Sequence, residues 1–190
     1  MKNLFERKTI TMAIPGIQTS YKKRMFRSRL EARWASLFDL FEWKYEYEPF
    51  DLNGWIPDFI LFGHLERTLV EVKPFSSETE FRQTLSRIIK AIADTCYQHT
   101  EFLLLGCTIF EKSTSFNDFP TIGWLFDGNS LDEAILNYHD NKYGFFHASG
   151  SWYDRITGEY DGDHLLTAPS QEEVFALWSS AGNSTQWKGG

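Results

Sequence analysis

One apolar segment constrains the fold of this chain more than any other. Residues 101–110 (EFLLLGCTIF) have the length of a β-strand and are apolar at nearly every position. Side chains along a strand point alternately to the two faces of its sheet, so this strand must be buried on both faces. The sequence therefore predicts a sheet that is flanked by helices.

Two upstream segments have the spacing of amphipathic helices. Apolar residues recur every three or four positions between Arg24 and Glu42. A second helix is expected to begin near Ser77, with an apolar stripe that runs from Phe81 to Cys96. Such spacing buries one side of a helix and leaves the other side in water, so both helices are expected to pack on the sheet.

Three shorter strands are predicted between these helices. Residues 43–50 alternate between aromatic and charged side chains, while residues 55–62 and 67–73 are largely apolar. Pro74 ends the last of these strands, because proline has no N–H to donate to a neighbouring strand. The order helix, three strands, helix, strand predicts an α/β fold with a mixed sheet, whose core spans residues 23–112.

The regions on either side of this core are less regular in sequence. We interpret residues 1–22 as a basic N-terminal arm, and residues 113–190 as an irregular C-terminal extension that packs on the core. Ser170 and Glu173 have the spacing of a capping box at a helix start. The elements expected in the extension are a strand at 122–126, a short helix at 131–138, a hairpin within 143–160 and a helix at 170–181.

The charge of the chain is distributed unevenly. The net charge is −7, but residues 1–33 hold nine Lys or Arg and two acids, which leaves −14 for the remainder. A basic end on an acidic body is typical either of a phosphate-binding surface or of a solvated tail. Composition does not decide between these two interpretations.

The sequence does indicate in which cellular compartment the protein is expected. No apolar stretch approaches the ~20 residues that span a bilayer, and no signal peptide is recognisable at the start. The two cysteines form no disulfide framework. We therefore expect a cytoplasmic protein without a membrane partner.

Acidic residues interrupt the two apolar strands at 55–62 and 67–73. Asp58 lies in the first strand, and Glu71 lies in the second with Lys73 two residues further along. If residues 63–66 form the loop, Ile60 pairs with Leu69 and Asp58 lies opposite Glu71. Two carboxylates would then stand about 5 Å apart at their Cβ atoms. Because such a pair is repulsive, this arrangement favours a divalent cation between the carboxylates, with Mg²⁺ or Mn²⁺ the best match for oxygen ligands.

A third carboxylate is available from the first predicted helix. Glu31 borders the apolar stripe of that helix, and Arg27 lies one turn earlier on the same side. Arg27 could pair with Glu31 or contact a phosphate. Carboxylates that hold a metal beside a lysine suit phosphodiester hydrolysis, in which the metal polarises the phosphate and the lysine orients or deprotonates water.

These residues resemble the signature of the PD-(D/E)XK nuclease superfamily. The resemblance rests on Pro57-Asp58, on Glu71-Val72-Lys73 and on the preceding helix that bears Glu31. The order of the predicted elements also resembles the restriction-endonuclease-like core of that superfamily. The run from Arg27 to Glu31 and the segments Tyr47-Glu48-Pro49 and Pro57-Asp58-Phe59 are similar to two groups within it. These groups are the endonuclease subunit of heteromeric transposases and a set of small phage and bacterial nuclease-like proteins, to which residues 178–187 are also similar.

The resemblance implies a Mg²⁺-dependent deoxyribonuclease, most simply an endonuclease, in a bacterial or phage-infected cell. It implies Glu31, Asp58 and Glu71 as metal ligands together with the Val72 carbonyl, and Lys73 as the catalytic lysine. Mn²⁺ would substitute for Mg²⁺, and no zinc is expected. DNA is the expected partner, with or without a protein partner or a second copy of the chain. The residues expected to contact DNA are Lys22, Lys23, Arg24 and Arg27.

Two other functions fit the same sequence. A catalytically silent nuclease fold would act as a DNA-binding or assembly subunit, and the acidic body of the chain favours a partner that supplies DNA binding. An RNA-directed nuclease would use the same residues on another substrate. Interpretations without a functional role are also open. Glu31 would then be a helix-surface acid, and Glu71 with Lys73 would be a surface ion pair on an edge strand.

Overall fold

The fold of the chain is described from a computed structural model. The described residues are 16–64, 66–75, 78–93, 95–96, 100–116, 118–150, 152–160, 162 and 165–185. Most of the expected N-terminal arm, the expected helix start at Ser77 and the end of the segment 178–187 therefore lie outside the described residues.

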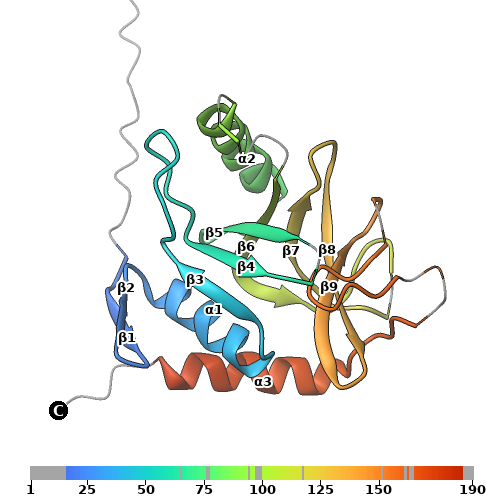
Figure 1. Cartoon of the computed structure of the whole chain (residues 1–190). Coiled ribbons are helices and arrows are strands. Elements are labelled where there is room, and N and C mark those ends of the chain that lie inside the picture. Colours follow the sequence, from blue (N-terminus) through green and yellow to red (C-terminus); the bar gives the residue numbers. More distant parts are fainter. Residues whose placement is uncertain are drawn as a thin grey trace, which may run out of the picture.

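A seven-stranded sheet forms the centre of the protein, and its strands are ordered in space as they are along the chain (Figure 1). One pair of neighbours breaks the antiparallel pattern: β5 and β6 run parallel, while the other neighbours run antiparallel. The sheet is therefore mixed, as predicted. The strands are β3 (Lys44–Tyr47), β4 (Phe59–Phe62), β5 (Arg67–Val72), β6 (Glu101–Phe110), β7 (Thr121–Phe126), β8 (Leu131–His139) and β9 (Lys142–His147).

Helices cover both faces of this sheet, which confirms the predicted α/β class. The helices are α1 (Arg29–Leu40), α2 (Glu78–Ile92) and α3 (Gln171–Ser184). Figure 1 shows α1 and α3 on one side of the sheet and α2 on the other. Alternation along the strands separates two cores: Val70 and Leu103 pack on the α1 side, while Leu69 and Leu104 pack on the α2 side.

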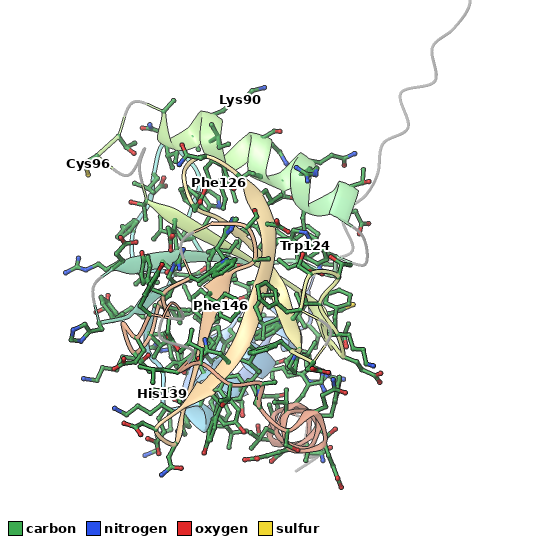
Figure 2. The ribbon with its side chains drawn as sticks, turned by 90° about the vertical axis from the view of Figure 1, so that its right-hand side faces the viewer. Lys90, Cys96, Trp124, Phe126, His139 and Phe146 are labelled. Atoms are coloured by element: carbon green, nitrogen blue, oxygen red, sulfur yellow. The ribbon has the colours of Figure 1, made fainter. Side chains whose placement is uncertain are left out.

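The core under α2 is rich in aromatic rings. The ring of Phe81, in α2, stacks on Trp124 of β7 with 4.4 Å between centroids. Figure 2 shows Trp124 and Phe126 beneath the helix and Lys90 on the side of the helix that faces away from the sheet. The amphipathic pattern seen in the sequence therefore corresponds to a buried and a solvated side of α2.

The first and last strands of the sheet come together on the α1 side. Trp43 directly precedes β3, and its indole N–H donates to the carbonyl oxygen of Tyr143 in β9 at 2.8 Å. The ring of Phe41 stacks on that of Tyr143 at 4.4 Å, and Trp43 lies 5.3 Å from Phe145. The sheet thus curves around α1, which holds that helix in a fixed position beside the strands.

The N-terminal part differs from the prediction. Residues 19–26 form a hairpin of β1 (Thr19–Tyr21) and β2 (Arg24–Phe26), so the helix that was predicted to begin at Arg24 begins at Arg29. Ser28 caps the helix by accepting a hydrogen bond from the N–H of Glu31. The apolar spacing before Ser28 coincided with a helix period, but the N-cap sets where the helix begins.

The C-terminal part is more regular than the sequence indicated. The predicted helix at 131–138 is wrong, because these residues form β8 between β7 and β9. Residues 121–147 extend the same sheet as the core, and the expected irregular extension is therefore continuous with it. The closing helix α3 is confirmed, and Ser170 accepts a hydrogen bond from the N–H of Glu173 as the capping box predicts. Within the described residues, no helix is long and apolar enough to cross a membrane.

Candidate active site

The hairpin of β4 and β5 has the register that the sequence predicts. Ile60 pairs with Leu69, and the ladder continues for one further pair towards Asp58 and Glu71. These two acids occupy the next position, where the strands separate. The Asp58 carboxylate closes this end by accepting a hydrogen bond from the N–H of Val72 at 2.7 Å. The strand geometry thus brings two carboxylates to one end of the hairpin.

Asp58 is completely buried, with 0% of its side chain exposed. One carboxylate oxygen accepts from the guanidinium of Arg27, and the other accepts from the N–H of Val72. Burial and the nearby charge of Glu71 raise the pKa of Asp58 to about 7, and the opposing effect of Lys73 is smaller. A carboxyl group in such a position gains most from an additional cation.

The ammonium group of Lys73 lies among three oxygen atoms. It is 2.7 Å from Oε1 of Glu71, 3.4 Å from the carbonyl oxygen of Val72 and 3.7 Å from Oδ2 of Asp58. Burial opposes the charged form of this lysine, but Asp58 and Glu71 outweigh it and raise the Lys73 pKa. The resemblance implies three carboxylates and one carbonyl as metal ligands, and two of these carboxylates converge with the carbonyl on one positive charge.

Glu31 is held differently. Its carboxylate accepts hydrogen bonds from the hydroxyl groups of Tyr47 at 2.6 Å and Ser28 at 2.9 Å, and from the backbone N–H of Arg27 at 3.2 Å. Only 5% of the residue is exposed, so it is not a helix-surface acid. The Ser-x-x-Glu spacing of residues 28–31 is typical of a capping box, and that signal was present in the sequence. Glu31 thus fastens the start of α1 to β3.

Arg27 connects these groups. Its guanidinium binds Asp58, lies 2.7 Å from Oε1 of Glu48 and 3.9 Å from Oε2 of Glu31. Burial alone would lower the Arg27 pKa, but Asp58, Tyr47 and the neighbouring glutamates raise it above the usual value. About half of the Arg27 side chain is exposed, so this cation can turn towards a ligand outside.

Two residues of the site were missed by sequence reasoning. Glu48 pairs with Arg27 because its strand end lies beside β2. Trp55 donates its indole N–H to Oε2 of Glu71 at 3.0 Å, which fixes the orientation of that carboxylate. Trp55 precedes Asp58 in a loop rather than in the predicted strand, because β4 begins at Phe59. No spacing rule connects an indole in a loop with an acid sixteen residues later.

Two hollows open on either side of Lys73. One has a volume of about 440 Å³ and is bordered by Arg27, Glu31 and Val72. The other, of about 280 Å³, is bordered by Trp55, Glu71 and residues of α2 that include Arg87. Lys73 borders both hollows, so a ligand in either one would reach its ammonium group.

The oxygen atoms of the site are of the type that binds a hard divalent cation, but their arrangement fits such a cation only in part. Carboxylate and carbonyl oxygens of Asp58, Glu71 and Val72 are the ligand types that Mg²⁺ and Mn²⁺ prefer. In the part of the chain that the structure describes, however, no three Asp, Glu, His or Cys side chains form a group that could hold a metal ion. The carboxylate of Glu31 faces Tyr47 and Ser28, and Lys73 occupies the point where the other oxygens converge.

The residues expected to contact DNA lie in two places. Arg27 is part of the site, whereas Lys22, Lys23 and Arg24 belong to the hairpin of β1 and β2. Lys22 forms an ion pair with Asp39 of α1 at 2.9 Å. Of the four expected DNA contacts, one therefore belongs to the site and three belong to the hairpin that precedes it in the chain.

Comparisons with protein-family models, with curated proteins and with solved structures find no match to this chain. The site and the mixed α/β fold therefore carry the functional argument.

Proposed function

We propose that this protein is a Mg²⁺-dependent nuclease of the PD-(D/E)XK type, which hydrolyses phosphodiester bonds of DNA as an endonuclease. The order α1, β3, β4, β5, α2, β6 is consistent with the restriction-endonuclease-like core that the sequence resembles. The proposal also assigns DNA as the partner and the cytoplasm of a bacterial or phage-infected cell as the compartment.

One observation carries the proposal. Oxygen atoms of Asp58, Glu71 and Val72 converge on a single cation, the ammonium of Lys73. Two buried carboxylates at a strand end repel each other, which costs free energy unless a cation lies between them. Their arrangement is accounted for by a cation that they bind together with a substrate.

The residues of the chain have distinct roles in this proposal. Asp58 and Glu71 would hold the metal with the Val72 carbonyl, and Trp55 would keep Glu71 in its orientation. Bound Mg²⁺ would polarise the phosphate and make the attacking water more acidic. Lys73 would orient that water and offset negative charge that develops on the phosphate. Arg27 would bind a phosphate oxygen, since its guanidinium is half exposed beside Asp58.

Glu31 has a supporting role in this arrangement. Its carboxylate anchors Tyr47 and the backbone of Arg27, and thereby positions the guanidinium that reaches Asp58. Ligation of the metal by Glu31 would require its hydrogen bond with Tyr47 to break. The proposal therefore keeps Asp58 and Glu71 as the principal ligands and Glu31 as the ligand that rearranges.

A second candidate function follows from a different feature of the same site. Arg27 and Lys73 already neutralise Asp58 and Glu71, so the cluster is electrostatically satisfied without a metal. A nuclease fold with such a cluster would be a catalytically silent DNA-binding or assembly subunit. The two candidates differ in whether divalent metal binds at Asp58.

The test is a cleavage assay with matched variants. Purified protein is incubated with supercoiled plasmid, linear duplex, single-stranded DNA and single-stranded RNA, each with Mg²⁺, Mn²⁺ or EDTA. Asp58→Ala and Lys73→Ala are compared with Lys90→Ala, which removes a lysine from the exposed side of α2. We expect metal-dependent cleavage of DNA that falls by about 10²–10⁴-fold in Lys73→Ala and is unchanged in Lys90→Ala.

The other outcomes separate the alternatives. Cleavage that persists equally in Asp58→Ala and Lys73→Ala would refute this site. An absence of cleavage together with an absence of Mn²⁺ binding in isothermal titration would favour the silent subunit. Cleavage of RNA in preference to DNA would change the substrate and leave the site assignment intact.

A further inference from the structure

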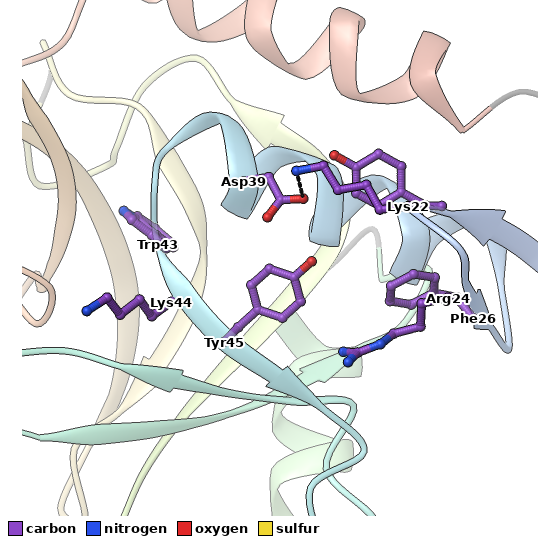
Figure 3. A pocket seen from close by; sticks show the side chains of 8 residues that line it. Lys22, Arg24, Phe26, Asp39, Trp43, Lys44 and Tyr45 are labelled. Atoms are coloured by element: carbon purple, nitrogen blue, oxygen red, sulfur yellow. Dashed lines mark ion pairs between the residues drawn. The ribbon is translucent and has the colours of Figure 1, made fainter.

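A third hollow is bordered by the hairpin of β1 and β2. It has a volume of about 430 Å³, within the range of pockets that hold small molecules. Figure 3 shows the side chains around it, which come from the hairpin of β1 and β2, from α1 and from β3. The lining residues are Tyr21, Lys22, Arg24, Phe26, Asp39, Trp43, Lys44 and Tyr45.

The charges of this pocket favour an anionic ligand. Its one carboxylate, Asp39, is paired with Lys22 at 2.9 Å. Arg24 and Lys44 are both exposed, and neither makes an ion pair with another described residue. The pocket therefore presents two available cations on a protein whose net charge is −7. Such a local excess of positive charge attracts phosphate groups.

The pocket also has an aromatic wall. The ring of Tyr45 is held from behind by Phe38 and Phe59, each 5.6 Å away between centroids. In the view of Figure 3, Tyr45 lies between the side chains of Lys44 and Arg24. Burial, followed by the charge of Asp39, raises the pKa of Tyr45 to about 12. Aromatic groups interleaved with cations are typical of surfaces that bind single-stranded nucleic acids.

The turn beside the pocket has an unusual composition. Lys22 and Lys23 connect β1 to β2 and both have positive φ angles, 45° and 66°. Asn and Gly are the residues that adopt this two-residue turn without strain. Strained backbone that persists in a folded protein is concentrated at functional sites. Two lysines in such a turn place positive charge at the rim of the pocket at a cost in stability.

The pocket and the candidate active site share their connecting elements. Arg24 begins β2 and Arg27 directly follows this strand, and the ring of Phe26 in β2 lies 4.5 Å from that of Tyr47 in β3. Tyr45 and Tyr47 are two residues apart in β3, which corresponds to about 7 Å along a strand. A ligand strand that leaves the pocket along β2 and β3 therefore meets Arg27, the half-exposed cation of the candidate site.

We infer that this pocket binds a single-stranded segment of nucleic acid, with a base against Tyr45 and adjoining phosphates on Arg24 and Lys44. The choice of nucleic acid over other phosphate ligands rests on the proposed function, because the path from the pocket leads to the candidate site. The pocket holds a strand that continues into or out of the cleavage site, so the substrate class is DNA with an unpaired segment next to the scissile bond.

The experiment measures binding without cleavage. Fluorescein-labelled oligo(dT) and oligo(rU) of about 12 nucleotides are titrated with protein in EDTA, and fluorescence anisotropy is recorded over a range of salt concentrations. The wild type is compared with Arg24→Ala/Lys44→Ala and with Tyr45→Leu. The matched control is Lys90→Ala/Lys112→Ala, which removes two exposed lysines outside the pocket.

We expect Arg24→Ala/Lys44→Ala to weaken binding about tenfold or more. The slope of log K against log salt should fall by about 1.4, since each phosphate contact on a single strand contributes about 0.7. Tyr45→Leu should weaken binding, because it removes the ring against which the base lies, and should leave the salt slope unchanged. The control should behave as the wild type. The charge reversal Lys44→Glu gives a second, single-site measurement should the double variant unfold at a lower temperature than the wild type.

Two outcomes overturn the inference: no binding of either oligonucleotide by the wild type, or equal weakening in the control variant. The result is independent of catalysis, because binding is measured in EDTA, without the metal that the proposed cleavage requires. If the wild type does not cleave DNA in Mg²⁺ but binds the oligonucleotide through Arg24 and Lys44, the proposed function fails and the pocket assignment remains. If cleavage depends on Asp58 but oligonucleotide binding is absent, the proposed function remains and the pocket assignment fails.

Discussion

Asp58 should make the folded protein less stable as the pH rises through neutrality. The carboxyl group is fully buried, and its pKa is raised from 3.8 to about 7 by burial and by Glu71. Because the folded state holds this proton more tightly than the unfolded chain does, the group stabilises the fold at low pH. That contribution is complete below about pH 4 and is lost as the pH passes 7.

The magnitude follows from the two pKa values. At pH 5 the unfolded chain has already lost the Asp58 proton, whereas the folded protein still retains it. Between pH 5 and pH 8 the folded protein therefore loses about 2 to 3 kcal/mol of stability through this one group. Other buried acids also titrate, including Asp154, whose pKa is raised chiefly by burial. A comparison with Asp58→Asn removes their shared contribution.

The assay is urea-induced unfolding followed by tryptophan fluorescence at pH 5, 6, 7 and 8, for the wild type and Asp58→Asn. The free energy of unfolding of the wild type should fall relative to the variant by about 2 to 3 kcal/mol across this range. A difference that does not change with pH would refute the raised pKa of Asp58. A wild type that gains stability relative to the variant on going from pH 5 to pH 8 would show that the ion pair with Arg27 outweighs burial.

Three further predictions concern the metal, the helix caps and a buried ion pair. At pH 8, Mg²⁺ at about tenfold above its dissociation constant should raise the unfolding temperature of the wild type by about 3–6 °C, and Asp58→Asn should show no such shift in differential scanning fluorimetry. Ser28→Ala should lower the free energy of unfolding by about 1–2 kcal/mol, more than the cap substitution Ser170→Ala, because the Ser28 hydroxyl also donates to a buried carboxylate. Arg155→Met should lower the free energy of unfolding in urea by about 3–5 kcal/mol, since it leaves the buried Glu101 without its partner at 2.8 Å. Adding Glu101→Gln to this variant should recover part of the lost stability. A loss below about 1 kcal/mol in Arg155→Met would contradict this prediction.

The local pattern of apolar and polar residues was sufficient to predict the central strands of the sheet. The apolar run 101–110 is a strand buried by helices on both sides, and β4 pairs with β5 in the register that the loop length and the apolar alternation require. A register shift of one residue would have placed Asp58 and Glu71 on opposite faces of the sheet. It would also have turned the core face of the shifted strand towards water. The juxtaposition of these two acids was therefore predictable from the sequence.

The spacing of apolar residues was misleading where it fits both the period of a helix and that of a strand. Leu131, Ala134, Ile135 and Tyr138 have helical spacing, yet they lie in β8 because β7 and β9 supply hydrogen-bonding partners on both sides. Neighbouring strands that are distant in sequence override the local preference of a short segment. The same limit applies to the helix that was expected from Arg24, where a hairpin and an N-cap move the start to Arg29.

The sequence by itself determined the class of the fold, the pairing of the β4–β5 hairpin and the placement of Asp58 beside Glu71. Only the tertiary structure decided what surrounds these acids: Arg27 from the hairpin side, Trp55 from a loop, and Tyr47 holding Glu31. The reason is physical. Register within a hairpin follows from periodicity and loop length, which are local, whereas the ion pairs and hydrogen bonds of a site depend on how separate elements pack, and no spacing along the chain encodes that packing.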